Sequence, residues 1–465
     1  MRDSQVMFRR FHIIVAIAIL AGCTTACVAG SADKDPGQEM RKLTALFGEE
    51  ALAADEIPRP SECRSISDAD ELRRLALGDS DPANSPTTIC LTTGEYVGPF
   101  ELGRDTTVWG PKDAVIVSNG QGTTVRLTGD HSSLLNLTVS GSGTRYDLQD
   151  AAVHVGADDT RIAGLVIRDA MFGLIVEKAN RVTVRGNRVH GTQEAALGLR
   201  GDSVRFWETR DSLIENNVIT HSRDIVVWYS ERNIIQGNIV SGSRYGTHFM
   251  YSHGNKVRDN SYVGNVVGIF AMYSRNLVLE RNLLADAHGA AGMGLGLKES
   301  GNLQIVDNNF IRNHTGVFVD NSPFVETDHN TFQGNVIRLS DTGVVFHSSP
   351  KRNNFYANSL RDNVNQVRVD GGGDATGMTW RRNDFDDYVG YDFNDDGIGD
   401  VPYELRRLSS QLAGRNEELQ FFHGTFALKI LNAVGHILPL YAPKTILIDP
   451  EPAMLAVSVE ERFAH

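Results

Sequence analysis

Short apolar runs alternate with glycine and asparagine through the middle of the chain. Runs such as Val182–Val184 and Leu277–Leu279 are rich in β-branched or aliphatic residues, and a glycine or asparagine follows soon after each. Such runs are typical of short strands. Helical periodicity is nearly absent between residues 100 and 385, so the pattern predicts an all-β fold there.

A serine–asparagine repeat sets the period of this fold. The same interval of eight residues separates Ser230 from Asn238, Ser252 from Asn260, Ser274 from Asn282, Ser300 from Asn308 and Ser322 from Asn330. Most of these asparagines lie 22 residues apart; Asn216 precedes them by one period, and Asn187 and Asn358 extend the series. A period near 22 fits one coil of three short strands. The repeat therefore predicts a right-handed parallel β-helix over residues 100–388, with roughly twelve coils.

Asparagine suits the corners of such coils. It tolerates a left-handed backbone, and its side chain can bond to its own chain. Stacked one per coil, the side-chain amides are expected to form a ladder in which each donates to the next. We interpret this serine and asparagine stack as structural.

The serines fix the register of the strands and thereby the two faces of the sheet. Tyr245–Ser252 and Val267–Ser274 align at 22 residues, and alternate positions such as Thr247 and Phe249 face the core. The residues between them form two outward columns. One column reads Trp228, Met250, Met272, Lys298, Asp320 and His347, with Glu177 as an earlier member, and the other reads Val226, His248, Phe270, Gly296, Phe318 and Val345.

These outward columns carry the main candidate chemistry. An exposed patch that combines Trp228, His248, Met250, Phe270 and Met272 is unusual for a monomeric surface. Two thioethers and an imidazole close together, as in His248, Met250 and Met272, suit soft Cu(I), but the pattern alone predicts only an interaction surface. The alternative is that this strip packs beneath the C-terminal tail or another protein. Turns nearby in sequence add three further candidate ligands, namely His253, His288 and Met293.

The N-terminus resembles a bacterial lipoprotein signal. Arg9 and Arg10 precede an apolar core, Ile13–Leu20, that is too short to span a bilayer and ends in Leu-Ala-Gly-Cys23. Residues 1–23 are therefore predicted to be a signal peptide and Cys23 a lipidated residue that anchors the protein to a membrane. The alternative is ordinary cleavage near Ala29, which would discard Cys23. Both readings predict an extracytoplasmic protein, with residues 24–60 as a polar tether.

Net charge and cysteine spacing argue against two functional classes. The formal net charge is −13 and no run of Lys or Arg stands out, which argues against non-specific nucleic-acid binding. The four cysteines show no CxxC spacing, so a thiolate metal site is not expected. In an oxidising compartment Cys63 and Cys90 are candidates for a disulfide within residues 61–99, which we predict to cap the start of the solenoid.

The C-terminal region begins with an acidic loop at residues 389–404. Oxygen-bearing side chains stand at positions 1, 3, 5 and 9 of a calcium-loop pattern, with a glycine at position 6 and Tyr403 in place of the usual glutamate at 12. The four candidate calcium ligands are Asp392, Asn394, Asp396 and Asp400. A metal-free acidic turn that closes the solenoid is the alternative. Residues 405–465 are predicted to form a helical tail that caps the solenoid or docks a membrane partner.

Several of these segments together resemble the NosD family over about residues 85–455. The resemblance rests on RYGTHFMYS (Arg244–Ser252), the repeated MYS (Met272–Ser274), GYDFNDDGIGDVPY (Gly390–Tyr403) and the tail around Pro439 and Pro450. It implies a periplasmic maturation protein for the copper site of nitrous-oxide reductase. Proteins of this kind work with an ABC transporter, made of a cytoplasmic ATPase and a membrane permease, and receive copper from a small lipoprotein chaperone.

Transferred to this chain, the resemblance implies that His248, Met250 and Met272 contact copper. It also implies that Trp228 and Phe270 form a partner surface and that the C-terminal helices dock the permease. Cys23 departs from the family pattern, because NosD-type proteins usually carry a cleavable signal.

The competing hypothesis is a carbohydrate-active β-helix enzyme, a uronate lyase, hydrolase or epimerase. Such enzymes need clustered carboxylates, or a basic residue beside calcium, in a groove. Lys298, Asp320 and His347 lie on successive coils, with Glu326 and Asp328 close in sequence, but Lys298 and Asp320 also read as a cross-coil ion pair. A purely structural surface or adhesion protein is a third alternative.

Overall fold

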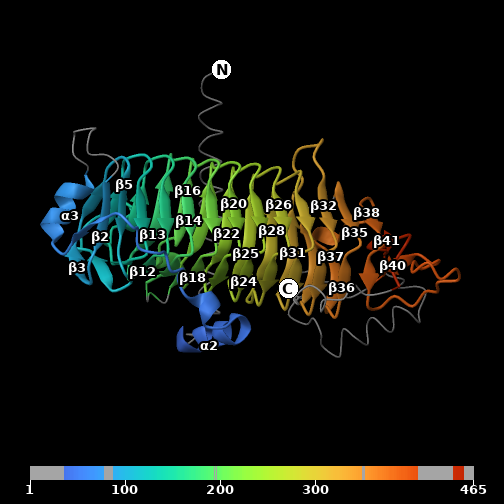
Figure 1. Cartoon of the computed structure of the whole chain (residues 1–465). Coiled ribbons are helices and arrows are strands. Elements are labelled where there is room, and N and C mark those ends of the chain that lie inside the picture. The colour runs from blue at the N-terminus through green and yellow to red at the C-terminus, as the bar shows by residue number, and fades with distance from the viewer. Residues whose placement is uncertain are drawn as a thin grey trace, which may run out of the picture.

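The protein is a solenoid of three parallel β-sheets, shown in Figure 1. The computed structural model describes residues 36–77, 87–192, 194, 196–347, 351–406 and 444–454. Most coils contribute one short strand to each sheet, and consecutive coils pair in parallel along the solenoid. The predicted right-handed parallel β-helix is confirmed, with about 13 coils, as the 13-stranded sheet shows.

The strands are short, most of them three to six residues long. The 14-stranded sheet contains β1 (Arg64–Ile66), β2 (Thr87–Leu91), β5 (Thr106–Trp109), β8 (Ser133–Leu135), β11 (Arg161–Ala163), β14 (Thr183–Arg185), β17 (Leu213–Glu215), β20 (Ile234–Gln236), β23 (Lys256–Arg258), β26 (Val278–Glu280), β29 (Gln304–Val306), β32 (Asn330–Gln333), β35 (Asn353–Tyr356) and β38 (Thr379–Arg381). The 12-stranded sheet contains β4 (Phe100–Leu102), β7 (Val125–Leu127), β10 (Ala151–Val155), β13 (Phe172–Glu177), β16 (Val204–Trp207), β19 (Asp224–Trp228), β22 (Tyr245–Met250), β25 (Val267–Met272), β28 (Met293–Lys298), β31 (Thr315–Asp320), β34 (Thr342–His347) and β37 (Asn365–Val369). The 13-stranded sheet contains β3 (Gly94–Val97), β6 (Ala114–Val117), β9 (Thr138–Ser140), β12 (Val166–Arg168), β15 (Arg188–His190), β18 (Val218–Thr220), β21 (Ile239–Ser241), β24 (Ser261–Val263), β27 (Leu283–Ala285), β30 (Asn309–Ile311), β33 (Val336–Arg338), β36 (Ser359–Arg361) and β39 (Asp384–Phe385).

An asparagine ladder runs along one corner of the coils. The backbone N–H and the side-chain Nδ2 of Asn217 both donate to Asn238 Oδ1 at 2.9 Å, and the same pair of bonds joins Asn238 to Asn260. The predicted ladder is thus confirmed. Its members are Asn187, Asn217, Asn238, Asn260, Asn282, Asn308, Asn335, Asn358 and Asn383.

Two members of the predicted series were wrong. Asn217 occupies the ladder in place of Asn216, whose φ of 53° places it in the left-handed turn just before. Asn335 occupies it in place of Asn330, which instead donates to Asn353 in a neighbouring column. A loop at residues 322–329 lengthens that coil, so the interval of eight residues no longer points to the same corner.

The N-terminal segment folds back along the solenoid. Helix α2 (Pro36–Phe47) lies beside the 13-stranded sheet near its middle (Figure 1), where Leu43 is buried with Val218 and Val263. A short 3-10 helix, η2 (Glu50–Leu52), follows. The chain then crosses earlier coils, where Ile57 N donates to Asn136 Oδ1 at 2.8 Å. Residues 36–60 of the predicted tether are therefore attached to the body of the solenoid.

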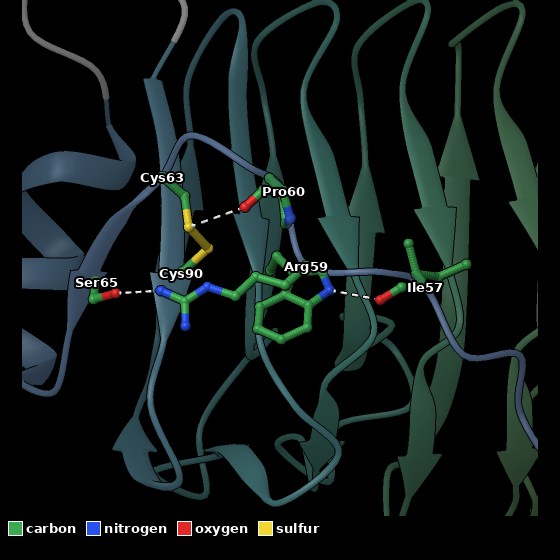
Figure 2. The surroundings of a disulfide bond; sticks show 7 residues. Ile57, Arg59, Pro60, Cys63, Ser65 and Cys90 are labelled. Carbon is green, nitrogen blue, oxygen red and sulfur yellow. Dashed lines mark hydrogen bonds between the residues drawn. A yellow bond between two sulfur atoms is a disulfide. The ribbon is translucent and has the colours of Figure 1, made fainter.

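A disulfide and a helix close the first coil. Cys63 and Cys90 form a disulfide bond that joins the crossing segment to β2, and Figure 2 shows the segment passing over the strands. Helix α3 (Ala69–Ala76) is capped by Asp68, whose side chain accepts the N–H of Glu71. The helix buries Leu72 against the core. Strand β1 already pairs with β2, so the sheet begins within the region predicted as a cap.

The other end is closed by an antiparallel pair, β40 (Tyr403–Leu405) with β41 (Leu447–Asp449). Two more 3-10 turns, η4 (Leu197–Leu199) and η5 (Asp370–Gly372), complete the elements. No helix in the described ranges is long and apolar enough to cross a membrane. The signal peptide with Cys23, and most of the helical tail predicted over residues 405–465, lie outside the described residues.

Candidate copper-binding face

The outer surface of β19, β22 and β25 carries the candidate ligands. Strand pairing places Trp228, Met250 and Met272 in one outward column, and Val226, His248 and Phe270 in the next. The columns continue through β28, β31 and β34 in the predicted register. Thr247 and Phe249, between the outward residues, are fully buried in the core. We call Trp228, His248, Met250, Phe270 and Met272 the outward patch.

His248 is the centre of the outward patch. Its Nε2 lies 3.3 Å from Met272 Sδ. Its side chain is almost completely buried beneath its aromatic neighbours, so the prediction that His248 is exposed was wrong. Burial lowers the pKa of His248 to about 4, with Asp224 opposing the shift and Arg244 and Arg223 adding to it. The imidazole is therefore neutral at pH 7, and its Nε2 points at a thioether.

The second ring nitrogen of His248 makes no hydrogen bond to any described residue, and neither does the indole nitrogen of Trp228. Both atoms are buried. The two rings meet edge to face, with centroids 5.4 Å apart. A buried donor without a partner carries a free-energy cost, so this patch is not optimised for stability alone.

Aromatic side chains surround the imidazole on three sides. The ring of Tyr245 lies 4.8 Å from that of His248, and the ring of Phe270 lies 6.1 Å away and nearly parallel. Gly296, the next residue in this column, leaves room for the Phe270 ring, because a Cβ there would lie 2.3 Å from it. Met250 and Met272 stand beside this aromatic cluster and are both partly exposed. Each of the two methionines therefore keeps part of its surface in contact with solvent.

A chain of buried ion pairs lies next to the patch, and the sequence did not point to it. Asp202 binds Arg205 at 2.9 Å and Arg223 at 2.8 Å, while Asp224 binds Arg244 and lies 3.7 Å from Arg223. Both carboxylates are fully buried. Burial raises the pKa of Asp202 and lowers that of Arg223 to about 10. We call these five residues the ion-pair chain.

The ion-pair chain touches the aromatic cluster through its arginines. The guanidinium of Arg205 lies 5.7 Å from the ring centre of Trp228, and that of Arg244 lies 4.5 Å from the ring centre of Tyr245. Such cation–π contacts are attractive when both groups are desolvated. In the sequence, the ion-pair chain appears only as a charged residue before the apolar run on successive coils. Charged residues at such positions are common in soluble proteins.

An exposed tyrosine stack borders the methionines and was also missed. Tyr229, Tyr251 and Tyr273 immediately follow the outward column, and their rings stack at 5.5 and 4.8 Å with nearly parallel planes. All three have φ near +50°, which turns each side chain out of the strand plane. Trp207 extends the aromatic row through its contact with Trp228 at 5.7 Å. The MYS repeat contained this signal, since its tyrosine recurs with the methionine.

The remaining copper candidates lie on two turns and at the start of β28. His253 is on the turn after β22 and accepts the N–H of Arg275 at 3.1 Å. His288 lies 3.8 Å from Asp286 on the turn before β28. Met293 begins β28, with its sulfur 3.4 Å from the Cβ position of Gly296, on the outward side. No hydrogen bond or ion pair between described residues joins His253 or His288 to the outward patch.

The acidic loop folds on its own hydrogen bonds. Asp392 accepts the N–H groups of Asn394, Asp396 and Gly397, and Asp400 accepts that of Phe393. Within the described ranges, no three His, Cys, Asp or Glu side chains are grouped as metal ligands. Both the calcium site and its alternative, a metal-free acidic turn, stay predictions.

The residues of the competing enzyme hypothesis do not form one cluster. Lys298, Asp320 and His347 occupy neighbouring outward positions, as expected. Asp328, however, is buried at another corner in a bidentate pair with Arg275 at 2.6 and 2.7 Å. No ion pair within 4.0 Å joins Lys298 to Asp320, so the predicted cross-coil pair was wrong; His347 instead lies 3.5 Å from Asp370.

Comparison with known proteins supports the resemblance. Residues 191–390 match the family model described as "Periplasmic copper-binding protein (NosD)". The chain is 25% identical over 396 residues to the "Probable ABC transporter binding protein NosD" of Pseudomonas aeruginosa, covering 80% of this chain and 89% of that protein. It is also 25% identical to the protein of that name in Stutzerimonas stutzeri, over 75% of this chain and 83% of that protein.

Similarity to solved structures is low. The surface adhesin PfbA of Streptococcus pneumoniae superposes with a TM-score of 0.47 and 12% identity, covering 65% of this chain and 88% of that chain. The predicted resemblance to NosD is thus confirmed by the family model and the two relatives, and the matched range contains the whole outward patch.

Proposed function

Because the chain resembles NosD over four fifths of its length, we propose that it is a periplasmic, non-enzymatic copper-handling protein that binds Cu(I) on the outward patch. The observation that carries this proposal is the approach of His248 Nε2 to Met272 Sδ at 3.3 Å, with Met250 next in the same outward column. The family description as copper-binding supports the choice of metal.

The donor set favours Cu(I) over harder metals. Thioethers are soft ligands that select Cu(I), and a neutral imidazole complements them. His248 Nε2 and Met272 Sδ lie 3.3 Å apart, so one Cu(I) ion could contact both atoms. The low pKa of His248 keeps the imidazole neutral at periplasmic pH, and in the tautomer protonated at Nδ1 the lone pair lies on Nε2. Little movement is then needed for both atoms to bind one ion.

The partial exposure of the two methionines suits transfer of copper to a partner rather than storage of copper. Met250 and Met272 are partly exposed, so a partner can reach the metal from outside. We propose Trp228 and Phe270, with the tyrosine stack, as the surface that such a partner contacts. The copper-donating chaperone and nitrous-oxide reductase are the proposed donor and client.

Both relatives are named "Probable ABC transporter binding protein NosD", which supports association of this chain with an ABC transporter. We propose that the transporter's permease and ATPase are partners of this chain too. Cys23 is the proposed lipid attachment site, which would hold the protein at a membrane surface. His253, His288 and Met293 are secondary candidates for binding copper, and the acidic loop is a candidate for calcium.

A Cu(I) titration against a chromophoric competitor tests the site. Changing Met250 and Met272 together to leucine should weaken Cu(I) binding at least about tenfold, the effect of losing about 1.4 kcal/mol. The matched control changes Met171 and Met454 to leucine, which removes two thioethers outside the outward patch. Equal affinity of the Met250/Met272 variant and the control would reject the site assignment.

A further inference from the structure

The change of strand length between β19 and β22 occurs directly beside the copper candidates. Asp224 pairs with Tyr245, but Val226 pairs with His248, so β22 contains one more residue than β19 over the same stretch. After such a bulge, the register between the two strands differs by one residue from the register before it. Because side chains alternate between faces, a slip of one residue would turn His248 and Met250 toward the core.

Asp224 holds this bulge in place. Its Oδ1 accepts the backbone N–H of Tyr245 at 3.0 Å and the Nε of Arg244 at 3.1 Å, and its Oδ2 accepts Nη2 of the same arginine. The carboxylate is fully buried, so these bonds are not exchanged with water. The residue therefore fixes the first residue of β22 at the point where the register changes.

The carboxylate of Asp224 also supports the aromatic side chains around His248. Arg244, held by Asp224, packs on the ring of Tyr245, which in turn lies 4.8 Å from the ring of His248. On the other side, the ion-pair chain continues through Arg223 and Asp202 to Arg205, which packs on Trp228. Two of the three aromatic neighbours of His248, Tyr245 and Trp228, are thus connected to one buried network.

We propose that Asp224 is a positioning residue for copper binding: without touching the metal, it sets the phase of β22 that turns His248 and Met250 outward. The proposal rests on the proposed function, because it assumes that the outward patch is the site that binds Cu(I). Outer residues that orient metal ligands typically change affinity by about 10–100-fold when they are replaced.

The test compares Asp224→Ala and Asp224→Asn with Asp328→Asn in the full-length protein. Asp328 is a matched control, because it is equally buried and makes a bidentate pair with Arg275 at a different corner. We expect Asp224→Ala to weaken Cu(I) binding at least about tenfold. Asp224→Asn keeps one oxygen for the N–H of Tyr245 and should lose less, which also provides a variant if the alanine protein does not fold.

A second measurement needs no copper. With Cys23 and Cys27 changed to serine, Met250→Cys should react quickly with a thiol reagent and Thr247→Cys slowly, since the first faces outward and the second the core. Asp224→Ala should reduce this contrast, whereas Asp328→Asn should preserve it. Unfolding in urea shows whether the control is destabilised to a similar degree.

The outcomes separate the two hypotheses. An unchanged thiol contrast in Asp224→Ala would overturn the positioning role, whatever happens to copper binding. Loss of affinity by Asp328→Asn equal to that of Asp224→Ala would overturn it too, because general destabilisation would then explain both. If the unaltered protein binds no Cu(I), the proposed function fails, while the thiol contrast still tests whether Asp224 sets the phase.

Discussion

Asp449 terminates the asparagine ladder by binding Asn383. Its Oδ2 accepts the backbone N–H of Asn383 at 3.0 Å and the side-chain Nδ2 at 2.9 Å, the same two bonds that each asparagine makes to the next. An aspartate from the far end of the chain thus takes the place of the missing next coil. The carboxylate is fully buried, and burial raises its pKa.

Replacing Asp449 should therefore open the end of the solenoid. In Asp449→Ala two buried donors of Asn383 lose their acceptor, and each unsatisfied group costs about 1–3 kcal/mol. We expect the free energy of unfolding of the last coils to fall by about 2–4 kcal/mol, measured as faster hydrogen exchange around β38 and β41. Asp449→Asn keeps an amide oxygen and should recover most of the loss. Equal protection in Asp449→Ala and the unaltered protein would show that the ladder needs no terminal acceptor.

An internal position of the ladder should be more sensitive still. Asn260 accepts both donors of Asn238, and its own amide donates to Asn282, to Ile235 O and to Arg258 O. Asn260→Ala should lower the free energy of unfolding by roughly 3–5 kcal/mol, at the upper end of single substitutions. Ser261→Ala, at the adjacent and partly exposed position, is the control and should change stability little. Urea unfolding of the two variants decides the point; similar midpoints would contradict it.

The coil repeat and its faces could be predicted from sequence because both are local and periodic. Apolar residues alternate with period two, and Ser252 and Ser274 mark one residue per coil, so the outward positions of His248 and Met272 followed directly. Where a loop lengthens a coil, as before Asn335, the count fails, because spacing along the chain no longer equals position around the coil.

The support of the site could not be predicted in the same way. Asp224 and Arg244 are ordinary charged residues in sequence, and only the packing of successive coils buries them together beneath Tyr245. The role of Asp449 depends on a return of the chain over more than 60 residues, which no local pattern encodes. Long-range contacts of this kind follow from the assembled fold and not from period or propensity.

The disulfide gives a prediction about the N-terminal end of the solenoid. Cys63 and Cys90 are 27 residues apart and join the crossing segment to β2. In the chain-entropy model a closed loop of this size stabilises the fold by about 3–4 kcal/mol. Changing both cysteines to alanine should lower the free energy of unfolding by about that amount, measured in urea at pH 7. Reduction of the unaltered protein with dithiothreitol should reproduce the loss, and an unchanged transition after either treatment would contradict the prediction.

The pKa of His248 predicts how the copper-free protein responds to acid. In the folded state this pKa is lowered to about 4, whereas in the unfolded chain it is near 6.5. Between these values the unfolded chain binds a proton that the folded state excludes, so the stability contributed by His248 falls as the pH falls. The greatest slope is about 1.4 kcal/mol per pH unit.

His248→Leu isolates this contribution, since leucine cannot bind a proton and keeps an apolar side chain among Tyr245 and Phe270. Relative to that variant, the unaltered protein should lose stability steadily as the pH is lowered from about 7 to about 4.5. Urea unfolding at several pH values, with the metal removed by a chelator, measures the difference. The charges that face the imidazole, Asp224 against Arg244 and Arg223, act in opposite directions, so burial decides the sign. Parallel stability curves for the two proteins would mean that His248 is open to water in solution and that the outward patch is looser than the structure shows.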